Sequence, residues 1–264
     1  HWMVHSFPTR RSSDLFGEAA GRPRVVVDGA PGAAWDEVEP RSLQFSADGL
    51  RFAYAARRGD NWRIVADRKE RREYDWIPEG SPAFSVPGAR LVYAARRGEN
   101  WRVVVEDQEG PPCSGLGAAD PVLGPGDRVA YLAAFGDSLR VVADGVPGRG
   151  YEWIADGSLT FSPDGRRLAF VAGRGAAQFV VVDGREEAPF TGIAETPLRF
   201  SADGSRLAYV AFRGEDQLVV LDGQPGPPFD AILPGGPAFR ADGTVEYLAE
   251  KQSRVLRVRQ ASEL

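Results

Sequence analysis

Histidine and cysteine are nearly absent from this chain of 264 residues. The two histidines, His1 and His5, both stand at the beginning, so the remainder offers no Ser-His-Asp triad, no Cys-His pair and no histidine metal site. The single cysteine, Cys113, excludes an intrachain disulfide framework and a cysteine-based zinc site. Hydrophobic and charged fractions of 43% and 26% are ordinary for a globular protein, which disfavours membrane insertion. We therefore expect no enzyme, no catalytic residues, no metal site and no cofactor.

The chain has little lysine and a small negative charge. Its formal net charge is −5, which disfavours a nucleic-acid partner. Lysine occurs only at Lys69 and Lys251, so 30 of the 32 basic residues (32 − 2) are arginine. Arginine codons are largely GC-rich, and this excess indicates a GC-rich bacterial genome. No window shows sustained apolar periodicity of 3.6 residues, so we predict no helix of consequence.

The chain is instead dominated by a repeat of 38–39 residues, with copies that start near positions 42, 81, 120, 158, 197 and 236. Three series of mostly aromatic residues hold this register. The first is Phe45, Phe84, Leu123, Phe161, Phe200 and Phe239; the second is Tyr54, Tyr93, Tyr131, Phe170, Tyr209 and Tyr247; the third is Trp35, Tyr74, Cys113, Tyr151, Phe190 and Phe229. Cys113 replaces an aromatic residue of the third series, which identifies it as a buried core residue.

Each repeat contains signals for four strands. A short apolar strand (43–46) is followed by a Ser-x-Asp-Gly turn and an alternating strand (51–55). A polar turn (57–61) leads to a third strand (62–66), and a weaker fourth strand (74–77) carries the third aromatic residue. Four strands in about 40 residues are typical of a propeller blade. We predict an all-β fold, a β-propeller of four-stranded blades that bury their faces against one another.

The segment Phe-Ser-Pro-Asp-Gly-Arg-Arg-Leu-Ala-Phe (161–170) resembles the core motif of the WD-repeat-like propellers of TolB-type proteins, and Phe-Ser-Ala-Asp-Gly at 45–49 and 200–204 is similar. The resemblance covers about residues 22–260. It implies a bacterial propeller, often exported and therefore periplasmic, that acts as a binding platform or as a gate on a serine peptidase domain. A cytoplasmic location stays open.

The first 15 residues do not follow the repeat. The segment 5–15, His-Ser-Phe-Pro-Thr-Arg-Arg-Ser-Ser-Asp-Leu, has no strand alternation and resembles a translated sequencing adaptor. We interpret residues 1–15 as a non-native leader and residues 16–264 as a single propeller domain. We favour seven blades, with a truncated first blade in this fragment; six blades are the alternative.

Aspartates recur in two of the turns and carry two interpretations. They follow the first strand at Asp48, Asp164, Asp203 and Asp242, and the third strand at Asp28, Asp67, Asp144, Asp183 and Asp222. Each carboxylate can satisfy its own turn, which is the reading we favour. A ring of carboxylates that binds calcium or a cationic partner is the alternative, although no Asp-x-Asp-x-Asp spacing appears.

The turns between the second and third strands are rich in arginine, glycine and tryptophan, a composition typical of interfaces. We predict a ligand- or partner-binding surface there, formed by Arg57, Arg58, Trp62, Arg96, Arg97, Trp101, Arg174 and Arg213. The partner is expected to be a protein, a peptide or an envelope ligand, with the oligomeric state left open. Solvated turns with ion pairs inside each loop are the simpler interpretation of these residues. Two other functions stay open: a regulatory propeller of a larger hydrolase or peptidase, and an enzyme that uses carboxylates.

Overall fold

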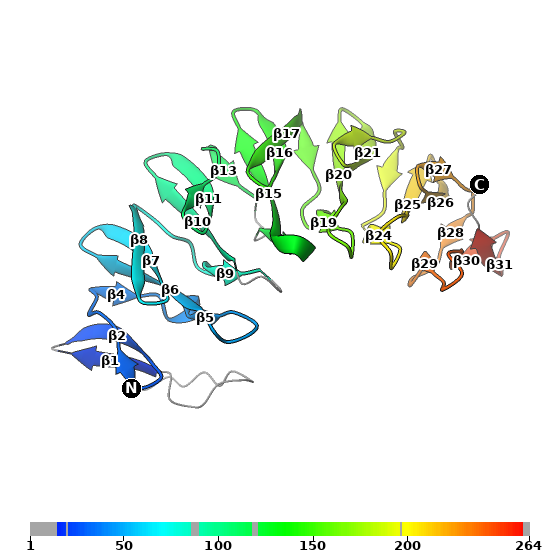
Figure 1. Ribbon diagram of the computed structural model, residues 1–264. Coiled ribbons are helices and arrows are strands. Elements are labelled where there is room, and N and C mark those ends of the chain that lie inside the picture. Colours follow the sequence, from blue (N-terminus) through cyan, green and yellow to red (C-terminus); the bar gives the residue numbers. More distant parts are fainter. Residues whose placement is uncertain (1–14, 20, 86–89, 118–120, 196, 261–264) are drawn as a thin grey trace. The chain divides into compact units, whose positions relative to one another are not determined.

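The computed structural model describes residues 15–19, 21–85, 90–117, 121–195 and 197–260, and the secondary structure of this part is almost entirely antiparallel β (Figure 1). Two short 3-10 turns, η1 (Pro40–Ser42) and η2 (Pro125–Asp127), are its helical elements. No helix in the described residues has the length and apolar character needed to cross a membrane. The chain forms two compact units, His1–Leu116 and Gly117–Leu264, each of which is described by itself.

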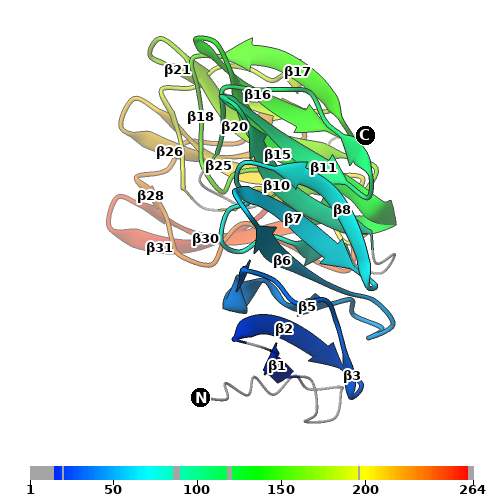
Figure 2. The ribbon, with the colours of Figure 1, turned by 90° about the vertical axis from the view of Figure 1, so that its left-hand side faces the viewer.

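The first unit contains three sheets. The first has the order β1-β2-β3 and the second the order β4-β6-β7-β8, with β5 also paired to β6. The third has the order β12-β11-β10-β9. Figure 2 shows β6, β7 and β8 side by side. The strands are β1 (Leu15–Ala19), β2 (Arg22–Val27), β3 (Ala30–Pro31), β4 (Glu37–Val38), β5 (Gln44–Phe45), β6 (Phe52–Arg58), β7 (Asn61–Ala66), β8 (Lys69–Tyr74), β9 (Ala83–Phe84), β10 (Leu91–Arg97), β11 (Asn100–Val105), β12 (Gln108–Glu109) and β13 (Gly115–Leu116).

The second unit repeats the same pattern. In each of its sheets a long strand is paired with a hairpin partner on one edge and with one or two short strands on the other. The strands are β14 (Val122–Gly124), β15 (Arg128–Phe135), β16 (Ser138–Ala143), β17 (Val146–Tyr151), β18 (Trp153–Ile154), β19 (Thr160–Phe161), β20 (Leu168–Arg174), β21 (Ala177–Val182), β22 (Arg185–Glu186), β23 (Gly192–Ile193), β24 (Arg199–Phe200), β25 (Leu207–Arg213), β26 (Asp216–Leu221), β27 (Gln224–Pro225), β28 (Ala231–Ile232), β29 (Ala238–Phe239), β30 (Val245–Lys251) and β31 (Arg254–Gln260).

The fourth strand differs from the one expected at 74–77. It begins earlier, directly after the third-strand turn, so that β8 covers Lys69–Tyr74 and ends on the third aromatic residue. The residues after that aromatic belong to the next repeat, because Trp76 bridges Arg96, and in the second unit Ile193 of β23 pairs with Ala211 of β25. The sheets with β6, β20, β25 and β30 thus take one edge strand from the end of the preceding repeat. A short apolar run does not reveal which of two neighbouring strands it joins.

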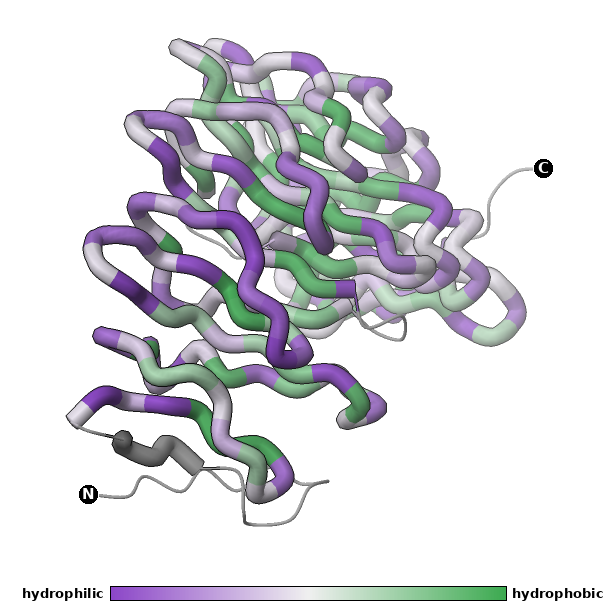
Figure 3. The backbone as a smooth tube through the Cα atoms, turned by 60° about the vertical axis from the view of Figure 1, so that its left-hand side comes forward, coloured by the Kyte–Doolittle hydropathy of each residue, from purple (hydrophilic) through white to green (hydrophobic). Residues whose placement is uncertain are grey.

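The core lies between consecutive sheets, and strand alternation explains how both faces are buried. In β6, Tyr54 and Ala56 pack toward the first sheet, together with Trp35 and Val25. Ala53 and Ala55 lie on the opposite face and pack toward the third sheet. Figure 3 shows the result along the chain, with apolar residues inside the strands and polar residues at the turns.

The expected all-β fold of four-stranded blades is confirmed by these sheets. The first sheet has three strands, β1, β2 and β3, which occupy the second, third and fourth places of a blade. Leu15, which we assigned to the leader, is the first residue of β1, and residues 1–14 lie outside the described part. The number of blades and the single-domain assignment stay predictions.

Candidate functional site

The aspartates after the first strand are used within their own turns. Ser46 Oγ donates a hydrogen bond to Asp48 Oδ1 over 2.6 Å, and the backbone N–H of Leu50 donates to the same oxygen. Gly49 has a φ of 68°, a conformation that glycine adopts without strain. The bond from Ser46 and that from Leu50 hold the pKa of Asp48 below its usual range. The same serine–aspartate pair recurs at Asp164 and Asp203.

The aspartates after the third strand hold the second strand of the same sheet. Asp67 Oδ1 accepts the backbone N–H of Phe52, and Asp67 Oδ2 lies 2.9 Å from Arg51 Nε. The same arrangement, with Oδ2 on an arginine Nε and Oδ1 on the backbone N–H of the next residue, recurs for Asp144 with Arg128, Asp183 with Arg167 and Asp222 with Arg206. Both sets of aspartates therefore have structural partners, which favours the turn interpretation over a calcium ring.

Four arginines at the start of second strands also reach the following sheet; we call Arg51, Arg128, Arg167 and Arg206 the interblade arginines. Arg167 donates through Nη1 to the carbonyl of Ser205 over 2.7 Å, and its guanidinium lies 5.5 Å from the ring centroid of Phe200. Arg128 bonds to the carbonyl of Gly165 in the same way. Arg51, Arg128 and Arg206 likewise lie over Phe84, Phe161 and Phe239. Each guanidinium thus joins a carboxylate of its own sheet to the ring of the next.

The described residues contain no group of three or more histidine, cysteine or acidic side chains placed to hold a metal ion. Cys113 is buried, and its Sγ–H donates to the carbonyl of Trp101 over 3.3 Å. Burial raises the pKa of the Cys113 thiol, which keeps it protonated. Its position is that of a core residue.

The turns between second and third strands are fixed by the repeat that precedes them. The N–H of Gly59 donates to Asp36 Oδ2 over 2.8 Å, and the N–H of Gly98 donates to Asp75 Oδ2 over 2.6 Å. Glu152, Thr191 and Asp230 accept the equivalent bonds in the second unit. These turns are therefore held in place before any partner binds.

In the second sheet, Arg57 and Arg58 lie at this turn but Trp62 does not reach the surface. Arg57 Nε lies 2.9 Å from Glu37 Oε2, and Arg58 Nη2 lies 3.3 Å from Glu70 Oε1 with its guanidinium over Trp35. Trp62 is only 6% exposed and packs in the core between the second and third sheets. Its alternation with Ile64 and Ala66 was the sequence signal for this burial.

In the third sheet, Arg96 and Trp101 lie together, whereas Arg97, the next residue of β10, points to the opposite face of the strand. Arg96 stands over the Trp101 ring at 5.8 Å, and Arg97 stands over Tyr74 at 4.9 Å. Arg97 Nη1 lies 3.5 Å from Glu109 Oε1. Trp76, which the sequence did not single out, is 41% exposed and meets Trp62 edge to face.

In the second unit, Arg174 and Arg213 occupy the same turn position. Arg174 Nη2 lies 3.2 Å from Glu186 Oε1, which also pairs with Arg149. Arg213 lies over the Phe190 ring at 5.9 Å. The simpler interpretation expected ion pairs within each loop. The ion pairs that these arginines form instead join different strands of a sheet, as Arg58 of β6 does with Glu70 of β8.

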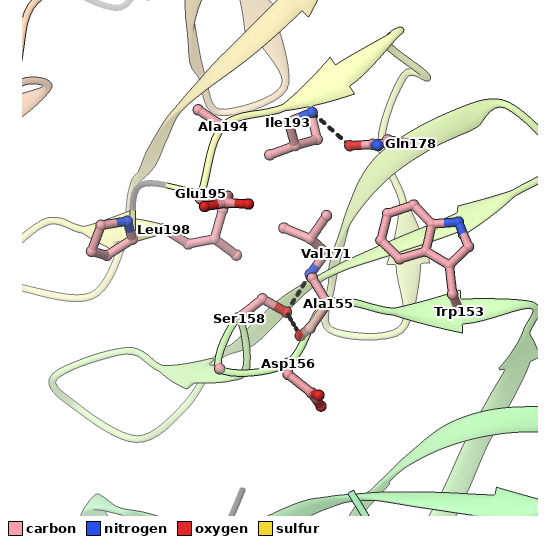
Figure 4. A pocket seen from close by; sticks show the side chains of 12 residues that line it. Trp153, Ala155, Asp156, Ser158, Val171, Gln178, Ile193, Ala194, Glu195 and Leu198 are labelled. Carbon is pink, nitrogen blue, oxygen red and sulfur yellow. Dashed lines mark hydrogen bonds between the residues drawn. The ribbon is translucent and has the colours of Figure 1, made fainter. Parts of the chain in front are cut away.

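A pocket that the sequence did not indicate lies in the second unit, between the sheets that contain β20 and β25. Its volume is about 540 Å³. Figure 4 shows that the Gln178 amide accepts the N–H of Ile193 and that the Ser158 hydroxyl lies between Val171 and Ala155. The lining residues include Trp153, Asp156, Val171, Gln178, Glu195 and Leu198.

No protein-family model matches the chain, and no curated protein does. Solved structures similar to it include TolB from Acinetobacter baumannii, with 16% identity and a TM-score of 0.35 over 78% of this chain; the match spans 60% of the TolB chain. The propeller domain of the Trilobed protease from Pyrococcus furiosus matches at 15% identity and a TM-score of 0.37, over 93% of this chain and 87% of that one. The propeller domain of Cps50 (Swd1) from Myceliophteria thermophila matches at 13% identity and a TM-score of 0.34, over 94% and 92%. These similarities concern the fold alone.

Proposed function

We propose that the chain is a non-enzymatic β-propeller scaffold that binds a protein, a peptide or an envelope ligand. The binding surface is the arginine rim of the first unit, which we define as Arg57, Arg58, Arg96 and Arg97 together with Trp76 and Trp101. The observation that carries the proposal is that exposed guanidinium groups lie over aromatic rings, Arg96 over Trp101 and Arg97 over Tyr74, on a turn that is already fixed.

The charges of the rim are available to a partner although each is partly compensated. The side chains of Arg58 and Arg97 are 45% and 48% exposed. A guanidinium has five donors, so a single carboxylate leaves several of them for a ligand. At such exposure the existing ion pairs contribute little, about 0–1 kcal/mol each, and exchange readily for a partner's carboxylate.

The apolar part of the rim is the exposed Trp76 ring and the half-buried Trp101 ring. Tryptophan and arginine are enriched among the residues that dominate binding energy at interfaces. Because the turns are held by Asp36 and Asp75, a partner orders little of this surface when it binds. This combination suits a peptide that carries acidic and aromatic residues.

The test is selection from a displayed peptide library on the immobilised full chain. We expect enriched peptides with acidic and aromatic residues, and at least tenfold weaker binding to the variant R58A/R97A/W76A. The variant R166A is the matched control, since Arg166 is 86% exposed in another turn. Peptides that bind the triple variant as well as the unaltered chain would place the site elsewhere.

The match to TolB spans 60% of the TolB chain. Any activity that this chain has as a whole protein is therefore part of what we propose. A hydrolase motif with a nucleophilic serine in the reading frame upstream would make the chain the regulatory propeller of a larger enzyme. Hydrolytic turnover by the full chain that is lost on Asp-to-Ala substitution would overturn the non-enzymatic part.

A further inference from the structure

We propose that the pocket of the second unit binds the side chain of an arginine residue in a peptide. The site is independent of the arginine rim, which belongs to the first unit. It consists of the segments that lead into β20 and β25, with Trp153 and Ala155 on one side and Ala194 and Glu195 on the other. Its volume of about 540 Å³ lies within the range of ligand pockets, roughly 300–1,000 Å³.

The charge of the pocket selects a cation. Two of its described lining residues, Asp156 and Glu195, carry carboxylates, and none of them is basic. In the described part of the chain no arginine or lysine forms an ion pair with either carboxylate. By contrast, Glu186 in the same sheet pairs with two arginines. Asp156 and Glu195 are therefore available to a cation from outside.

The walls of the pocket suit the long stem and flat head of arginine. Val171 and Leu198 supply apolar surface for the methylene groups. The Trp153 indole covers Gly173 so closely that a Cβ atom there would lie 2.1 Å from the ring. Gly173 thus allows the indole to lie flat along β20, where it lines the pocket. A guanidinium stacks on such a ring more readily than an ammonium group does.

The sequence explains why the pocket occurs at this place. Gln178 is the second residue of β21, the third strand of its repeat, and the equivalent residues of the earlier repeats are Trp62, Trp101 and Leu139. Trp62 is buried in the core between its sheets, next to Ile77. The shorter Gln178 leaves this space open, and its amide accepts the N–H of Ile193 at the edge of the pocket. Replacing Gln178 by tryptophan should therefore fill the pocket. Tryptophan already occupies the equivalent position in two other repeats, so the fold should accept it.

The experiment measures binding of N-acetyl-arginine amide and N-acetyl-citrulline amide to the full chain by saturation-transfer NMR. Citrulline has the same shape without the charge, and we expect it to bind at least tenfold more weakly. We expect Q178W to lose at least tenfold in arginine affinity. The matched control is Q217W, because Gln217 makes the same bond to Ile232 but does not line this pocket.

A second variant covers the case in which Q178W fails to fold, as judged by circular dichroism. We expect D156N/E195Q to reduce arginine affinity at least fivefold and to leave citrulline binding unchanged. The rim variant R58A/R97A/W76A should bind the arginine probe normally, which separates this site from the proposed function. Equal binding of both probes, or unchanged arginine binding by folded Q178W or by D156N/E195Q, would overturn the proposal.

Discussion

The interblade arginines yield the sharpest stability prediction, and Arg167 is the best example. Its Nε lies 3.1 Å from Asp183 Oδ2, its Nη1 donates to the carbonyl of Ser205 over 2.7 Å, and its guanidinium covers Phe200. The side chain is 30% exposed. Replacement by methionine keeps an apolar stem of similar length and removes all three polar contacts.

The expected cost follows from these contacts. A half-exposed ion pair contributes about 0–1 kcal/mol after solvent screening. A charged hydrogen bond to a carbonyl adds about 1 kcal/mol, and the cation–π contact adds about 0.5–1 kcal/mol. Arg167→Met is therefore expected to lower the free energy of unfolding by roughly 2 kcal/mol. For a domain of this size that corresponds to a fall of about 4–8 °C in the melting temperature.

The neighbouring Arg166 supplies the control. It lies in the same turn, is 86% exposed, and its guanidinium lies 3.7 Å from Asp164. We expect Arg166→Met to change the melting temperature by less than about 1 °C, since an exposed pair contributes almost nothing. Both variants are measured by calorimetry at neutral pH. Equal shifts for the two variants would refute the view that the interblade arginines hold the sheets together.

Three further predictions concern separate features. Hydrogen bonds from Ser201 and Ser205 lower the pKa of Asp203 to about 2. The ionised carboxylate therefore stabilises the fold above its unfolded pKa of about 4, and this stabilisation is lost as the pH falls toward 2. In thermal melts, Asp203→Asn should reduce the fall in melting temperature between about pH 4 and pH 2. Asp75→Ala removes the acceptor of the Gly98 N–H, so exchange of the Gly98 amide with deuterium should accelerate at least fivefold, whereas that of Gly59, which is held by Asp36, should not change. Val255 and Leu256 of β31 are 63% and 40% exposed, and V255T/L256T should reduce self-association of the chain in sedimentation experiments; unchanged association would place the contact elsewhere.

Much of the fold was predictable because the turns and strands of each repeat are encoded in short segments of sequence. The Ser-x-Asp-Gly turn at Ser46 is complete within a few residues, and the alternation in Phe52–Arg58 defines both faces of that strand. The edge strands β4, β18, β23 and β28 were not predictable in this way. Each comes from the end of the preceding repeat, and a short pair such as Gly192–Ile193 fits either neighbouring sheet equally well.

The site was predictable only in part, for a similar reason. Composition found the arginines, but it did not show which carboxylates they meet, because partners such as Arg58 and Glu70 are joined by strand register. Trp62 lies two residues from Ile64 in β7 and therefore on the same face of the strand, so the signal for its burial was present in the sequence. The pocket depends on a difference between repeats, because Gln178 stands where an earlier repeat has Trp62. The sequence shows this difference, but only the packing around the two residues shows that the smaller side chain leaves a pocket.

The hydrogen bonds that fix the turns all run in one direction along the sequence, from a turn to the repeat before it. Five turns between second and third strands take an acceptor from the repeat before them, as Gly98 does from Asp75. A nascent chain emerges with its N-terminus first, so each of these turns finds its acceptor already synthesised. Shortening from the C-terminal end therefore leaves the remaining turns tied, whereas loss of a repeat at the N-terminal end releases the turn that follows. The two ends of the chain are thus expected to tolerate truncation unequally.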